Sequence, residues 1–176
     1  MSLETISSIP RGPAIRAYRE EDAPSVRACI VELQDDMRRF DERLGSGESM
    51  ADAYLEYLFD QCRTCLGRIL LAEFDREVAG FVCVLARVPH EGLDQPPGHY
   101  AFITDLIVRE PFRRRGFGEA LLLEAERWAH AAGATDVRIG VLSENADAIR
   151  LYERAGFKSY SLILVKQLAA HAQGTR

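Results

Sequence analysis

Three adjacent arginines and two closely spaced glycines stand at the start of a predicted helix in PFRRRGFGEALLLEAERWAHAAG, residues 111–133. Gly116 and Gly118 lack the side chains that would keep a ligand away from the backbone. The first turn of a helix exposes unpaired N–H groups and the positive end of the helix dipole, and the arginines add positive charge. These features favour a phosphate or pyrophosphate cradle formed by the main-chain amides of 113–118. The alternative is a solvated basic turn.

Two other phosphate-binding loops are excluded by the sequence. The string G-x-x-x-x-G-K-[ST] does not occur in the chain. The dinucleotide fingerprint G-x-G-x-x-G/A fails because Leu121 stands where a third small residue is required. A nucleotide-binding domain of either type is therefore not expected.

The elements that must position this loop follow from the apolar pattern and its breaks. With 47% hydrophobic and 28% charged residues, we expect a single domain over 1–176, with a core of about 14–167. Asp22 as N-cap and Pro24 mark a helix start, and Gly67 and Gly133 are expected to close helices. The predicted strands are 14–20, 68–74, 77–88, 99–108, 136–142 and 160–168, and the predicted helices are 22–43, 49–66, 117–132 and 145–156.

Two segments resemble a known family. LIVREPFRRRGFGEALL is similar to the acetyl-CoA-binding motif of the GNAT N-acetyltransferases, a hydrophobic strand followed by [RQ]-x-x-G-x-[GA] at a helix start. Arg113, Gly116 and Gly118 occupy its defining positions. NADAIRLYERAGF resembles the second signature of the family and matches it at Asn145, Ala148, Tyr152, Gly156 and Phe157. The motifs occur in the family's order, and the resemblance covers about 14–167, most strongly 102–157.

The resemblance implies a fold, a cosubstrate and an activity. The fold is α/β (α+β), with a mixed, mostly antiparallel central sheet that is flanked by helices and splayed at its central strands. The activity is transfer of an acetyl group from acetyl-CoA to a primary amine by direct attack in a ternary complex, with no metal. An unpaired N–H beside the splayed strand could stabilise the oxyanion. The coenzyme would contact Leu106, Ile107, Val108, Arg113, Arg114, Arg115, Gly116, Phe117, Gly118, Asn145 and Tyr152.

The chemistry requires a base and an acid. A lysine-type amine has a pKa near 10.4, so a base must remove a proton before it can attack. Asp105 is the candidate, against a purely structural carboxylate or a base such as Glu32 acting through water. Tyr152 matches the general acid of the family, against a role in core packing. Asn145 is either a coenzyme contact, a helix N-cap, or both.

The acceptor is left open by the sequence. Acids in the first two helical segments hint at a cationic amine, against a solvated helix face: Glu32, Asp35, Asp36, Asp41, Glu42 and Glu48. A polyamine, an aminoglycoside, an amino acid, a protein N-terminus or a lysine would each fit. The segments expected to shape the acceptor site are 22–66 and 89–98. A non-catalytic acyl-CoA-binding or sensor domain is the competing function.

Composition limits the possible partners, location and metal content of the protein. The net charge is −5 and the arginine triplet is the only basic cluster, which argues against nucleic acid as a partner. No run approaches the roughly 18 apolar residues of a membrane span, and the first residues do not read as a secretory signal, so we expect a cytoplasmic protein. Cys62 and Cys65 form a C-x-x-C without a second ligand pair, so we expect no metal site. Exposed strand edges would allow a homodimer.

Overall fold

The computed structural model describes residues 12–90 and 98–167. Its sheet has the strand order β1-β2-β3-β4-β5. The first four strands are antiparallel and β5 runs parallel to β4, which confirms the expected mixed, mostly antiparallel sheet. The strands are β1 (Ala14–Ala17), β2 (Gly67–Phe74), β3 (Glu77–Pro89), β4 (His99–Val108) and β5 (Val137–Ile139).

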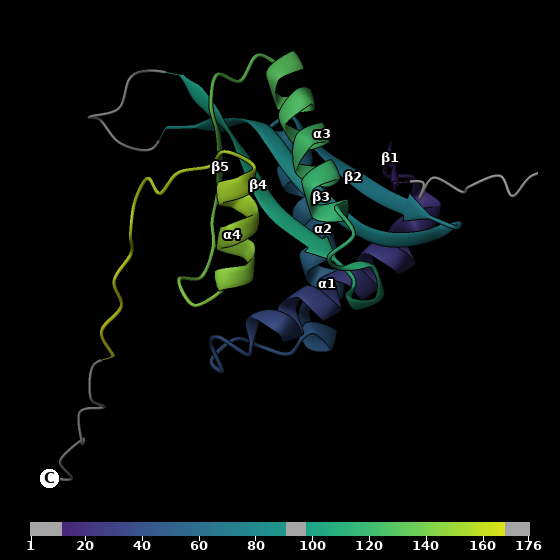
Figure 1. Cartoon of the computed structure of the whole chain (residues 1–176), viewed down its shortest axis with the longest axis horizontal. Coiled ribbons are helices and arrows are strands. Elements are labelled where there is room, and N and C mark those ends of the chain that lie inside the picture. The colour runs from purple at the N-terminus through teal and green to yellow at the C-terminus, as the bar shows by residue number, and fades with distance from the viewer. Residues whose placement is uncertain (1–11, 91–97, 168–176) are drawn as a thin grey trace, which may run out of the picture.

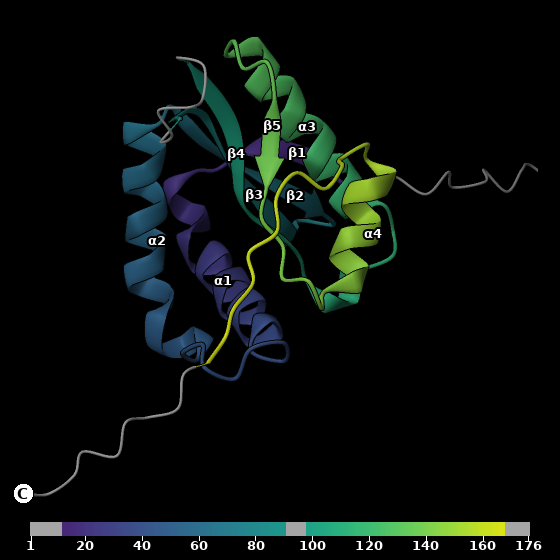
Figure 2. The same ribbon diagram turned by 90° about the vertical axis from the view of Figure 1, so that its left-hand side faces the viewer.

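Helices cover both faces of this sheet. They are α1 (Ala23–Met37), α2 (Gly47–Thr64), α3 (Phe117–Ala131) and α4 (Ala146–Arg154), with short 3₁₀ turns at Glu20–Asp22 and Glu110–Phe112. Figure 1 shows the whole chain, and Figure 2 shows α1 and α2 on one side of the sheet and α3 on the other. Each face has its own apolar core, one around Ile30, Leu58 and Phe81 and the other around Ile103 and Leu121.

A β-bulge in β4 changes which side chains face which layer. Cys83 of β3 pairs with Asp105, but its neighbour Val84 pairs with Ile103, so Thr104 is an extra residue on β4. Before the bulge, Ile103 packs in the core under α3. After it, Ile107 packs in the core under α1 and α2. Without the extra residue, Ile103, Asp105 and Ile107 would all point to one face.

The sheet is splayed between β4 and β5, as expected. The two strands pair only from Ala101↔Val137 to Ile103↔Ile139. The fourth strand continues to Val108, whereas β5 ends at Ile139 rather than at residue 142 as predicted. Among the described strands, none pairs with the second half of β4 on this side.

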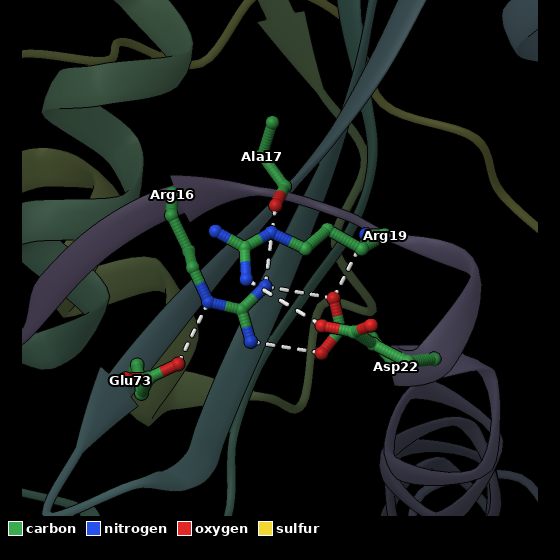
Figure 3. Close-up of polar contacts among 6 residues, drawn as sticks. Arg16, Ala17, Arg19, Asp22 and Glu73 are labelled. Carbon is green, nitrogen blue, oxygen red and sulfur yellow. Dashed lines mark hydrogen bonds and ion pairs between the residues drawn. The ribbon is translucent and has the colours of Figure 1, made fainter.

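The start of α1 differs in detail from the prediction. Asp22 precedes the helix, but its carboxylate caps no helical N–H. It accepts hydrogen bonds instead from Arg16 Nη1 at 2.7 Å, from Arg16 Nη2 at 2.8 Å and from the N–H of Arg19 at 2.8 Å (Figure 3). The bonds from Arg16 are the main reason that the pKa of Asp22 is lowered. Arg16 also donates to Glu73 at 2.7 Å, so this cluster joins β1, α1 and β2.

Two helix ends were also predicted differently. The first helix ends at Met37 instead of residue 43, and α2 ends at Thr64. The left-handed residue after α2 is Leu66, with a φ of 48°, and not Gly67, which begins β2. Gly67 is instead a close-packing residue, because a Cβ there would lie 2.6 Å from the Cα of Cys62. Gly133, with a φ of 93°, follows α3 as predicted.

The predicted last strand, 160–168, is wrong for the residues that the structure describes. Residues 158–167 form no strand or helix, and they run away from the sheet in Figure 1. Tyr160, Leu162, Ile163, Leu164 and Val165 are 70–86% exposed. Strand-forming residues need a neighbouring strand to pair with, and none of the five described strands pairs with this segment. Position 168 and most of the predicted loop, 91–97, lie outside the described residues.

Candidate active site

The loop between β4 and α3 is shaped as an open cradle. Arg114 and Gly116 have positive φ angles of 61° and 81°, which turn the main chain sharply before α3 begins at Phe117. The first N–H groups of α3 have no carbonyl in a preceding turn to bind. A Cβ at Gly116 would meet no heavy atom within 4 Å, so the backbone is accessible on that side. This arrangement suits a phosphate group.

The three arginine side chains have different positions. Arg113 donates from Nε to the carbonyl of Val108 at 2.8 Å, and from Nη2 to Glu32 at 2.9 Å and Asp36 at 2.5 Å. Through these ion pairs, the positive charge of Arg113 attaches the loop to α1. The guanidinium of Arg115 lies 4.4 Å from the ring centroid of Phe74, a cation–π contact. Arg114 is exposed.

A cavity of about 510 Å³ opens in front of this loop. Its walls are the end of β4, the loop, the start of α3, one side of α4, and the end of α1 with the turn that follows it. All the predicted coenzyme residues except Arg115 line it: Leu106, Ile107, Val108, Arg113, Arg114, Gly116, Phe117, Gly118, Asn145 and Tyr152. Gly118 also lets α4 approach α3, because a Cβ there would lie 3.0 Å from Cδ2 of Leu151.

A second cavity, of about 330 Å³, lies between the splayed strands and the α1–α2 layer. Asp105, directly after the bulge, is 5% exposed and lines it. Its Oδ1 accepts a hydrogen bond from the hydroxyl of Tyr54 at 2.9 Å. Its Oδ2 is buried and has no hydrogen-bond partner among the residues that the structure describes. Burial raises the pKa of Asp105, and the nearby hydroxyls of Thr104 and Tyr54 offset part of this rise.

Tyr152 lines both cavities. Its ring packs against Phe157 with the centroids 6.0 Å apart, so the packing role and a position at the site coexist. Burial and, second, the charge of Asp105 raise the pKa of Tyr152 to about 12. The phenol is therefore protonated at neutral pH.

Asn145 has the N-cap role that the sequence offered as one of two alternatives, and its coenzyme contact stays a prediction. Its Oδ1 accepts the N–H of Ala148 at 3.1 Å, which caps α4. Its side chain stands where the two cavities meet, since it lines both. A capped helix N-terminus thus forms part of the wall beside Tyr152.

Glu32, the alternative base, has a different environment. Its Oε1 accepts the N–H of Glu110 at 2.7 Å as well as the bond from Arg113, and its Oε2 lies 3.6 Å from Arg109. It does not line the cavity that contains Asp105. Because its carboxylate neutralises arginines, Asp105 is the better placed of the two acids to take a proton from an amine.

Sequence reasoning missed Tyr54 altogether. It lies 51 residues before Asp105 and comes from α2. A tyrosine on the apolar stripe of a helix is typical of a core position. Only its hydrogen bond to Asp105 of β4 shows that Tyr54 also belongs to the site. The structure also brings Cys62 of the C-x-x-C next to Cys83, at an Sγ–Sγ distance of 3.7 Å, a contact that the sequence did not indicate. All four cysteines are free.

Curated relatives match about half of the chain. A segment of 91 residues, 50% of this chain, is 38% identical to L-ornithine N5-acetyltransferase NATA1 of Arabidopsis thaliana. A segment of 94 residues, 53% of this chain, is 27% identical to the uncharacterized N-acetyltransferase YycN of Bacillus subtilis. The matches span 38% and 56% of the lengths of these two relatives.

Solved structures match nearly the whole chain. A putative acetyl transferase from Pyrococcus furiosus superposes with a TM-score of 0.69 and 26% identity, over 88% of this chain and 99% of that one. The aminoglycoside N-acetyltransferase AAC(6′)-Iy in complex with CoA superposes with a TM-score of 0.63 and 18% identity, over 89% and 99%. The model of the Acetyltransferase (GNAT) family matches residues 15–157. This match covers most of the chain, and both sequence motifs lie beside the splay of the sheet. The chain therefore belongs to the GNAT acetyltransferase family.

Proposed function

We propose that this protein transfers an acetyl group from acetyl-CoA to a primary amine, by direct attack while both substrates are bound. One observation carries the proposal: Tyr152 is a wall common to the cavity at the phosphate cradle and the cavity that contains Asp105. A thioester in the first cavity and an amine in the second would therefore meet beside its hydroxyl. Such proximity is a large part of catalysis in a ternary complex.

Acetyl-CoA fits the first cavity in its chemistry. The amides of 113–118 would hold the pyrophosphate, and Arg114 would add charge from the rim. The pantetheine arm would lie along Leu106, Ile107 and Val108, where β4 has no β5 residue beside it. An N–H on that edge would also be available to the thioester oxygen as negative charge develops. The aminoglycoside N-acetyltransferase that shares the fold is in complex with CoA, which supports this assignment.

The side chains divide the proton transfers between them. Asp105 accepts one proton from the bound ammonium, and the free amine then forms the new C–N bond as the C–S bond breaks. The thiolate takes a proton from Tyr152, and the second amine proton passes to solvent. Neutralising Asp105 removes a charge that raises the pKa of Tyr152. The first transfer therefore makes the tyrosine a stronger acid for the second.

The experiment is acetyl-CoA calorimetry combined with a thiol-release assay on a panel of amines. We expect binding and the release of one thiol per amine acetylated. The competing function, an acyl-CoA-binding or sensor domain, predicts binding without thiol release on every amine. No heat with acetyl-CoA would refute both. A cytoplasmic location is part of the proposal, because four free cysteines suit a reducing compartment. No helix in the described residues is long and apolar enough to cross a membrane.

A further inference from the structure

The cavity around Asp105 contains one charge in an apolar enclosure. Among the described residues that line it, Asp105 is the only carboxylate, and none is an arginine, a lysine or a histidine. Its polar neighbours are neutral amides and hydroxyls. The apolar walls come from α1, α2, β4, the segment after β5 and α4: Ile30, Leu33, Met37, Met50, Leu106, Ile139, Val141, Leu142 and Ala148.

Five of the six acids that the sequence analysis named in the first two helical segments form ion pairs or hydrogen bonds within the protein. Glu32 and Asp36 bind Arg113, as described above, and Glu48 lies 2.7 Å from Arg27. Two others are also engaged: Asp41 pairs with Arg43, and Asp35 accepts the N–H of Gly47 at 2.9 Å. None of these five lines the cavity around Asp105. The acidic composition is therefore no sign of a polycationic acceptor.

We propose that the acceptor is a small primary amine with a single positive charge on an apolar carbon skeleton, an inference that rests on the proposed function. The ammonium group binds the unpartnered Oδ2 of Asp105, and the skeleton lies among the apolar walls. A second ammonium, or the carboxylate of an amino acid, would lose its water without gaining a partner of opposite charge. About 330 Å³ is at the lower end of the range for small-molecule sites. Met37 and Met50 give the walls adaptable shape.

The first test is a homologous series at saturating acetyl-CoA: ethylamine, butylamine and hexylamine. Each buried methylene contributes enough to raise kcat/KM about fourfold, so the values should climb along the series until the cavity is filled. L-ornithine and spermidine, which carry further charges, are the comparison. We expect hexylamine to exceed both by at least about tenfold.

The second test is the variant Met50→Glu, which changes the charge of the cavity wall. Met50 lies in the first turn of α2, where a carboxylate is compatible with the helix dipole, so the variant should fold. A second carboxylate in the cavity wall should lower kcat/KM for hexylamine and raise it for 1,4-diaminobutane. Met50→Leu conserves the volume and adds no charge, so it should not raise kcat/KM for 1,4-diaminobutane.

The outcomes separate this inference from the proposed function. If L-ornithine or spermidine is acetylated more efficiently than hexylamine, the inference is wrong while the transfer activity stands. If acetyl-CoA binds but no amine is acetylated, the transfer activity is refuted. In that case amine binding, measured by the shift in melting temperature, tests the inference: hexylamine must stabilise the protein more than spermidine does.

Discussion

Gly116→Ala, with Gly133→Ala as its control, tests the cradle directly. Both glycines have left-handed backbones, with φ angles of 81° and 93°, and an added Cβ would meet no heavy atom within 4 Å at either position. The cost to folding is then backbone strain alone, about 1–2 kcal/mol in each variant. For a chain of this length that lowers the melting temperature by about 2–8 °C. Equal losses of stability are the expected baseline.

The two variants should separate in their affinity for acetyl-CoA. Gly133 lies at the opposite end of α3, whereas a Cβ added at Gly116 would stand on the open side of the loop. If that methyl group displaces a phosphate from one backbone N–H, about 1.5–3 kcal/mol is lost, since hydrogen bonds to charged groups are of this size. Calorimetry well below both melting temperatures should then show Kd raised about ten- to a hundredfold for Gly116→Ala and unchanged for Gly133→Ala. Equal Kd values in the two variants would contradict the cradle.

Three other substitutions test the side chains. Tyr152→Phe should lower kcat by about a hundredfold and leave the Kd of acetyl-CoA within about twofold; an unchanged kcat would remove Tyr152 from the acid role. Asp105→Asn should abolish transfer and stabilise the protein at pH 7. The native carboxyl keeps its proton to a higher pH than in the unfolded chain, where the pKa is near 3.8, so wild-type stability falls as pH rises through that window. Urea unfolding of the wild type and of Asp105→Asn at pH 4 and pH 7 measures this difference in stability. A stabilisation by Asp105→Asn that is the same at both pH values would be inconsistent with a buried charge. Arg113→Met removes the positive charge that Glu32 and Asp36 share and leaves each with one more distant arginine, Arg109 and Arg39. The loop then becomes more negative, so acetyl-CoA should bind more weakly, and the loss should shrink at high salt. A loss of affinity that salt does not change would rule out this electrostatic explanation.

The sequence could predict the parts of the fold that residue types enforce locally. Gly116 and Gly118 indicated a cradle because they lack side chains that would block a ligand, and the structure adds that one forms a left-handed turn and the other lets α4 approach closely. The hairpin turn at Asp75 and Arg76 was likewise expected from the break between two apolar runs, and both residues have positive φ. Asn145 was identified by its match to the second family signature, with a helix N-cap as the alternative.

The parts that depend on distant partners could not be predicted. No residue type requires a bulge at Thr104, yet that extra residue directs Asp105 towards α2 and the hydroxyl of Tyr54. The segment from Tyr160 to Val165 has the composition of a strand, but pairing depends on a neighbour that the segment itself does not encode. The acidic residues of α1 could be counted in the sequence, but their neutralisation by Arg113 could not.

The exposed segment 160–165 has a consequence for handling the protein. An extended, apolar and unpaired stretch is a template on which other chains can stack into intermolecular β-structure. The chain has only two lysines, Lys158 and Lys166, and they stand immediately outside the stretch on either side. Flanking charges of this kind act as gatekeepers, because stacked copies would bring like charges together. Precipitation should therefore increase with acetylation of these lysines or with ionic strength, and solution work belongs at low concentration.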